Sequence, residues 1–139
     1  MKFAQGGKSG AAYMALSERE GLDLWRRALT ASVRSDAPDM TARQQAILMI
    51  VALTPGPHTV RGLAEMLDIA KPAVTRALDA LGKAGLVTRS RDLRDQRSVL
   101  VERTVDGMAY LRAHARLIVA AAEGELQDEP KQQKQSAAA

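Results

Sequence analysis

The sequence of 139 residues contains no cysteine, only 3% aromatic residues and no long apolar run. Without cysteine the chain can form no disulfide, no thiolate zinc site and no cysteine redox switch. No apolar stretch reaches the roughly 18 residues of a membrane span, and the N-terminal segment lacks the apolar run of a secretion signal. The two histidines, His58 and His114, cannot by themselves form a closed zinc site. We therefore expect a cytoplasmic protein with no metal and no cofactor.

Catalytic motifs are also missing from the chain. It has no nucleotide-binding glycine loop, no GxSxG sequence and no HExxH sequence. No serine can be placed beside a histidine and a carboxylate by the logic of spacing. We therefore predict that the protein is not an enzyme.

The basic residues, by contrast, are concentrated in one segment. Residues 71–103 hold eight basic and four acidic side chains, and this difference accounts for the whole net charge of +4. A basic segment on a neutral remainder suggests an anionic partner such as nucleic acid. The alternative is a solvated loop with its counterions.

The apolar spacing predicts one domain that contains five helices and a short hairpin. We expect a flexible lead-in at 1–13, the domain at 14–126 and a disordered polar tail at 127–139. The helix starts are marked by capping residues or by a proline in the first turn, at Ser17, Thr41, Thr59, Lys71 and Thr104. Between the last two helices the period changes, which predicts two short strands at 86–89 and 98–101.

The third and fourth predicted helices are short and joined by a tight turn. This arrangement is typical of a helix-turn-helix, whose second helix lies in the DNA major groove. That second helix covers about residues 71–84 and turns Thr75, Arg76, Asp79 and Lys83 outward. Arginine can form two hydrogen bonds with guanine, and lysine can reach phosphate. Asp79 could accept from cytosine, or it could pair with Arg76 one turn earlier.

An arginine-rich hairpin tip follows this helix directly, which is the position of a wing. Arginine side chains fit a narrow minor groove, where the negative potential is concentrated. We expect the wing at 90–97 to enter that groove through Arg94. Asp92 and Asp95 would oppose phosphate unless they act as braces for arginine, Arg97 in particular. The expected DNA contacts are Lys71, Pro72, Ala73, Thr75, Arg76, Asp79, Lys83, Arg91, Arg94 and Arg97.

The sequence of this segment resembles the MarR family of winged-helix transcription regulators. The resemblance runs from about Thr41 to Gly107 and rests on five motifs: LAEML at 63–67, VTRALDAL at 74–81, GLV at 85–87, DLRDQR at 92–97 and TVDG at 104–107. It implies that Thr75 and Arg76 read the major groove and that Arg94 enters the minor groove. The predicted fold is mainly α with a small β-hairpin wing (α+β), a winged helix-turn-helix flanked by dimerisation helices.

The resemblance also implies a homodimer formed by the first and last helices, here about 15–35 and 105–126, and in many members a small-molecule effector. The side chains expected at the interface are Leu22, Trp25, Leu29, Tyr110, His114, Leu117 and Ala121. The chain departs from the family in one place. The family commonly has two helices after the wing, and this sequence has room for one, so we expect an abbreviated interface or one shifted onto the first helix.

We therefore expect a bacterial, nucleoid-associated transcription regulator that binds a pseudo-palindromic site on double-stranded DNA as a homodimer. Two alternatives remain at this point. One is a winged-helix protein-interaction module that uses its apolar helix faces. The other is an architectural DNA binder that clamps the backbone with little base readout, which equal affinity for random duplexes would favour.

Overall fold

The computed structural model describes residues 15–124, and these fall into two compact units. The described part of the first, here called the central unit, is 37–113. The second, here called the terminal unit, comprises 15–36 and 114–124. The lead-in and the tail predicted at 1–13 and 127–139 lie outside the described residues.

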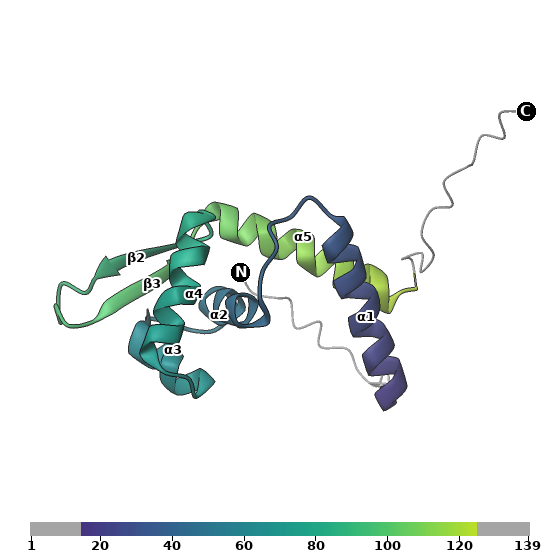
Figure 1. The fold of residues 1–139 in the computed structure, drawn as a ribbon, viewed down its shortest axis with the longest axis horizontal. Helices are drawn as coiled ribbons and strands as arrows, with labels where there is room; N and C mark the ends of the chain where they lie inside the picture. Colours follow the sequence, from purple (N-terminus) through teal and green to yellow (C-terminus); the bar gives the residue numbers. More distant parts are fainter. Residues whose placement is uncertain (1–14, 125–139) are drawn as a thin grey trace, which may run out of the picture. The chain divides into compact units, whose positions relative to one another are not determined.

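The described chain forms five helices and three strands, as Figure 1 shows. Their order is α1 (Glu18–Arg34), α2 (Ala42–Leu53), β1 (His58–Thr59), α3 (Val60–Leu67), α4 (Lys71–Lys83), β2 (Val87–Arg91), β3 (Val99–Arg103) and α5 (Val105–Ala122). The unit boundary falls within α5, whose first half belongs to the central unit and whose second half belongs to the terminal unit. Among residues 15–124, no helix has the length and apolar character that crossing a membrane requires.

The helices begin where the capping residues predicted them. The hydroxyl groups of three N-cap residues accept a hydrogen bond from the backbone N–H three positions on, at Ser17, Thr41 and Thr59. Pro72 lies in the first turn of α4, where its missing N–H costs no helical hydrogen bond. After α4, Gly85 has a φ of 76°, the left-handed conformation that glycine adopts most easily.

The sheet has three strands, and the prediction of a two-stranded hairpin was incomplete. β3 lies between β1 and β2, and both pairings are antiparallel. In β1, His58 pairs with Val101. Its ring nitrogen Nε2 lies 3.1 Å from the carbonyl oxygen of Thr54. A strand of two residues is too short for alternation to reveal, so only the tertiary pairing with β3 identifies it.

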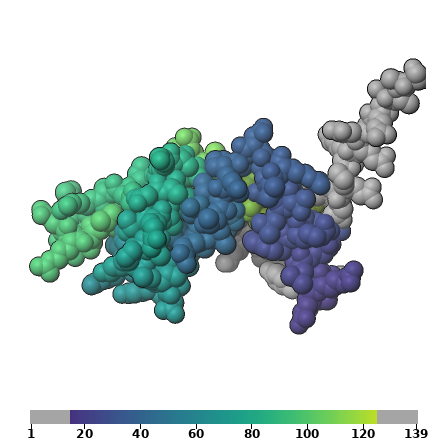
Figure 2. Space-filling model, in the orientation of Figure 1, coloured from purple at the N-terminus to yellow at the C-terminus, as the bar shows by residue number. Residues whose placement is uncertain are grey.

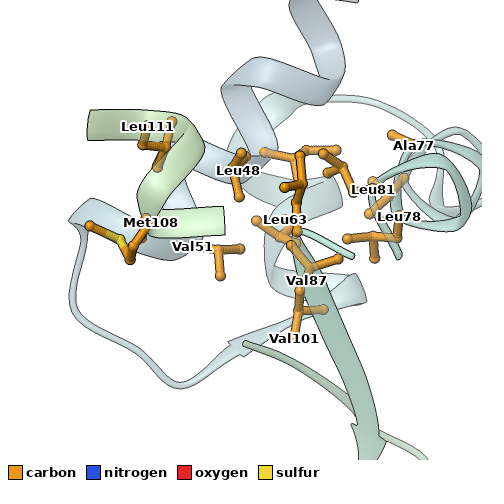
Figure 3. Close-up of a cluster of buried hydrophobic side chains, with 14 of the residues drawn as sticks. Leu48, Val51, Leu63, Ala77, Leu78, Leu81, Val87, Val101, Met108 and Leu111 are labelled. Carbon is orange, nitrogen blue, oxygen red and sulfur yellow. The ribbon is translucent and has the colours of Figure 1, made fainter. Parts of the chain in front are cut away.

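The core of the central unit is assembled from its helices and from strands β2 and β3 (Figure 3). Helices α2, α3 and α4 contribute the largest fully buried side chains: Ile47, Leu48, Leu63, Val74, Leu78 and Leu81. Val87 and Val101 bury the base of the β2–β3 hairpin in the same cluster, and Met108 and Leu111 add the first half of α5. The core therefore holds α4 and the base of the hairpin as one body.

A second feature joins α5 to the turn between α4 and β2. The backbone N–H of Thr104 donates to the carbonyl oxygen of Leu86 at 3.2 Å, and its hydroxyl donates to the carbonyl of Gly85 at 2.7 Å. The same hydroxyl accepts from the N–H of Gly107 at 2.9 Å and so caps α5. A Cβ atom on Gly107 would overlap the Leu86 carbonyl oxygen. Glycine is therefore required there by close approach.

We expect Gly107→Ala to lower the free energy of unfolding by about 1–3 kcal/mol, because the added methyl group forces backbone apart in a packed region. The matched control is Gly21→Ala in α1, where a Cβ would meet nothing within 4 Å. That change should be neutral or raise stability by about 0.5–1 kcal/mol, since alanine is the better helix former. Chemical denaturation measures both. Equal stabilities for the two variants would show that a methyl group at residue 107 is accommodated beside the Leu86 carbonyl without cost.

Candidate nucleic-acid interface

Helix α4 presents one polar face to solvent and one apolar face to the core. Its buried residues are Val74, Ala77, Leu78 and Leu81. The outward face carries Thr75, Arg76, Asp79 and Lys83, all exposed, as the 3.6-residue period predicted. At the start of the helix Lys71 and Pro72 are exposed and Ala73 is partly buried. The four polar side chains are therefore accessible to a partner outside the protein.

Asp79 does not pair with Arg76, which was one of its two expected roles. Its Oδ1 atom accepts a hydrogen bond from Nη2 of Arg89 in β2, at 2.7 Å. The Nε–H group of Arg76 instead donates to the carbonyl oxygen of Pro72 at 3.3 Å, one turn earlier in the helix. The ion pair of Asp79 thus links α4 to the hairpin, and Arg76 has no carboxylate partner among residues 15–124.

The hairpin of β2 and β3 lies beside α4 and extends past it. Figures 1 and 2 show the two strands projecting from the helices of the central unit. Its base is held by buried Val87, which pairs with Arg103 in the register of the sheet. From Thr88 to Arg91 every residue of β2 is exposed. The hairpin therefore has the position and form of a wing.

The tip of the wing is held by two aspartates that accept hydrogen bonds from backbone N–H groups. Asp92 Oδ1 accepts from the N–H of Arg94 at 2.9 Å, and Asp95 Oδ1 accepts from the N–H of Arg97 at 3.1 Å. Oδ2 of Asp95 also accepts from the hydroxyl of Ser98 at 3.2 Å. The expected pairing of the Arg97 side chain with an aspartate is absent from the described residues. The aspartates brace the loop through its backbone, as Asx turns do.

This arrangement leaves the arginine side chains of the wing exposed. Within residues 15–124 no ion pair involves Arg91, Arg94 or Arg97. The acidic groups therefore shape the loop without neutralising its guanidinium groups in contact pairs. Cationic side chains on a loop of defined shape suit an anionic groove.

We expect Asp95→Ala to loosen the wing tip and to leave the global fold intact. The substitution removes the acceptor for the Arg97 N–H and the Ser98 hydroxyl, while the core lies elsewhere. Amide hydrogen exchange of Arg97 should speed up by about tenfold or more, since the N–H group loses its acceptor on Asp95. The melting temperature should change little. Glu102→Ala, which removes another exposed carboxylate of the hairpin, is the control; matching exchange in the two variants would contradict the bracing role.

One arginine that faces α4, Arg89, was not singled out from the sequence. The signal was present in the alternation of β2. Successive side chains of a strand point to opposite faces, so Arg89 lies on the face of buried Val87. The pairing with Asp79 depends on the tertiary contact of α4 with β2 and has no counterpart in local spacing.

The structure offers no metal site in the part of the chain that it describes. Residues 15–124 contain no group of three or more histidine or acidic side chains that could hold an ion.

A hollow of about 370 Å³ lies beside β3, lined by Val51, Gly56, Pro57, His58, Leu100, Val101, Glu102 and Arg103. One guanidinium nitrogen of Arg103 donates to the Ala52 carbonyl at 2.7 Å, which ties β3 to the end of α2.

The expected dimerisation residues are distributed over both units. Tyr110 belongs to the central unit, and burial raises the pKa of its hydroxyl. The hydrogen bond with Gln45 lowers this pKa, and the charge of Asp39 raises it. In the terminal unit His114 and Ala121 are buried, and Leu29 and Leu117 are partly buried. Leu22 and Trp25 in α1 are exposed.

Helix α1 also carries a local charge cluster next to these apolar residues. Asp23 Oδ1 lies 2.7 Å from Nη2 of Arg26, and its Oδ2 lies 3.1 Å from Nε of Arg27. The hydrogen bond from Arg26 lowers the pKa of Asp23 below its ordinary value, because it stabilises the charged carboxylate. Asp23 and Arg26 also line a shallow groove along the helix, together with Leu22, Trp25 and Leu29.

Comparison with known proteins bears on the central unit. Residues 40–99 match the model of the MarR family, which confirms the resemblance seen in the sequence over this stretch. A search of curated proteins gave no match. The family consists of transcription regulators, in line with the prediction that the protein is not an enzyme.

Solved structures share the fold. The chain resembles transcriptional regulator Tm0710 from Thermotoga maritima, with 23% identity, a TM-score of 0.59 and coverage of 74% of this chain and 67% of that one. It is 32% identical to a variant of ZitR from Lactococcus lactis, with a TM-score of 0.52. That match covers 66% of this chain and 60% of ZitR, so this chain spans less than two thirds of it.

The structure of MepR from S. aureus was solved as a complex with DNA. It is 21% identical to this chain, with a TM-score of 0.60, and the match covers 77% of this chain and 82% of MepR. At this identity the likeness concerns the fold alone. Together with the family match it identifies the described fold as a winged helix-turn-helix.

Proposed function

We propose that this chain, which carries a MarR-family winged helix over residues 40–99, is a sequence-specific DNA-binding transcription regulator. In this proposal α4 enters the major groove and the wing enters the adjacent minor groove. A homodimer would place two α4 helices one turn of DNA apart, so the site would consist of two inverted half-sites about 10 bp apart. The DNA complex of MepR supports DNA as the partner for this fold.

The observation that carries the proposal is the exposed cationic surface shared by α4 and the wing. Lys71, Arg76 and Lys83 of α4 are exposed, and so are the three wing arginines. The acidic residues among them are engaged in internal contacts, Asp79 with Arg89 and Asp92 with the wing backbone. A positive surface of this kind attracts the phosphate backbone.

The roles of the side chains follow from their chemistry. Arg76 and Thr75 lie on the outward face of α4 and are assigned to base edges, because arginine can form two bonds with guanine and threonine can contact thymine. Lys71 and Lys83 near the two ends of the helix are assigned to phosphates. Arg94 at the wing tip is assigned to the minor groove, with Arg91 and Arg97 beside it.

We expect Arg76→Ala to weaken binding to the preferred duplex by about 1–3 kcal/mol and to relax the preference at one base pair. The preferred duplex is the one that wild-type protein selects from a random pool, and repeating the selection with the variant measures the preference. Arg116→Ala, which removes an exposed arginine from α5, is the control. An Arg76→Ala variant that binds every duplex more weakly by the same factor would assign Arg76 to phosphate and would favour an architectural binder.

The homodimer is a separate part of the proposal. Its support is the apolar surface that α1 leaves exposed, with Leu22 71% exposed and Trp25 49% exposed. Large apolar side chains that share a groove on one helix are typical of a protein interface. We propose that this groove receives the terminal unit of a second copy.

We expect the double substitution Leu22→Asp and Trp25→Asp to convert a dimer into a monomer, because it places carboxylates in an apolar interface. Light scattering coupled to gel filtration measures the mass of each form. Val105→Asp places a carboxylate on another exposed apolar residue, at the start of α5, and should leave the dimer intact. A wild-type monomer that retains a bound protein from the cell would favour the interaction module.

A further inference from the structure

The wing has a face that is turned toward α4, and two arginines belong to it. Val87, Arg89 and Arg91 alternate along β2 and therefore share one face of the strand. Val87 is buried in the core that contains α4, and Arg89 reaches Asp79 in α4. The face of Val87, Arg89 and Arg91 is thus the inner face of the wing, and Thr88 and Ser90 lie on the outer face.

This inference rests on the proposed function, because it uses the position of DNA between α4 and the wing. The major and minor grooves of a duplex are separated by a sugar-phosphate strand. A protein that has α4 in one groove and the wing tip in the next must have that strand between them. The inner face of the wing therefore meets a row of phosphates.

We propose that Arg89 binds a phosphate of this strand and that Asp79 positions its guanidinium group for the contact. The guanidinium group has five N–H donors, and the contact with Asp79 at 2.7 Å uses one on Nη2. The Arg89 side chain remains 33% exposed and that of Asp79 59% exposed. Both groups are therefore accessible to a ligand from the solvent side.

The surroundings of the Arg89 guanidinium fix where it lies. A Cβ atom on Gly82 would be 4.0 Å from Nη2, so the group lies close above the last turns of α4. Asp79 holds it from one side, in an ion pair between two residues that are ten positions apart in sequence. An ion pair this exposed adds little to folding stability. Its main consequence is that the Arg89 guanidinium group is held in one place. This planar, forked donor has the geometry that binds phosphate best.

The experiment replaces single phosphates of the selected duplex by neutral methylphosphonates along the strand between the two grooves. For wild-type protein, one position should weaken binding by about tenfold, because a charged hydrogen bond is lost. Arg89→Ala should weaken binding to the unmodified duplex by a similar factor. The methylphosphonate at that position should then have no further effect on the affinity of the variant. Its salt dependence, the slope of log affinity against log salt, should fall by about 1. Arg116→Ala serves as the control and should match wild type.

Two conservative variants separate positioning from charge. Arg89→Lys keeps the charge but lacks the planar fork, so we expect an unchanged salt slope and a smaller methylphosphonate effect. Asp79→Asn leaves Arg89 in place but removes its ionic partner, and the same pattern is expected. Thermal unfolding of each variant ensures that a folded protein is compared.

The results that would overturn the inference are distinct from those that would refute the proposed function. If each methylphosphonate weakened binding of the Arg89→Ala variant as much as it weakens binding of the wild-type protein, Arg89 would contact none of these phosphates. A wild-type profile in Asp79→Asn would remove the positioning role of Asp79. Failure of the wild-type protein to bind any duplex at low salt would instead refute DNA binding itself.

Discussion

The carbonyl oxygen of Leu86 lies at the point where four elements of the central unit meet. Leu86 follows α4 and begins the approach to β2, and its carbonyl accepts the N–H of Thr104, between β3 and α5. Gly107 approaches the same oxygen so closely that it has no room for a Cβ atom. This joint, together with the burial of Val87 and Val101, sets the wing against α4. The spacing between the two candidate DNA-contacting elements therefore depends on backbone contacts far from the wing tip.

The distribution of acidic groups gives the basic surface its form. The carboxylates of the wing tip and of α4 contact groups of the protein itself. Asp92 and Asp95 accept from backbone N–H groups, and Asp79 accepts from Arg89. These contacts shape the loop and link it to the helix. The arginines at the tip remain exposed, so the segment is both basic and of defined geometry. A flexible basic loop would attract DNA equally well but would lose conformational entropy on binding.

Much of the fold was predictable because its signals are local. Capping hydroxyl groups at Thr41 and Thr59, proline in the first turn of α4 and glycine after it each act on backbone within four residues. The outward position of Arg76 follows from the helical period for the same reason. β1 and the partner of Asp79 were missed because both depend on residues distant in sequence, β3 for the first and Arg89 for the second.

The sequence by itself determined where the helices begin, which face of α4 is polar and that the positive charge gathers in residues 71–103. Local hydrogen bonding and the 3.6-residue period are sufficient for these features. Only the tertiary structure decided that Arg89 lies against α4 and that β1 completes the sheet. These features arise from side chains and strands that meet through packing, and packing brings together residues whose separation in the chain carries no periodic signal.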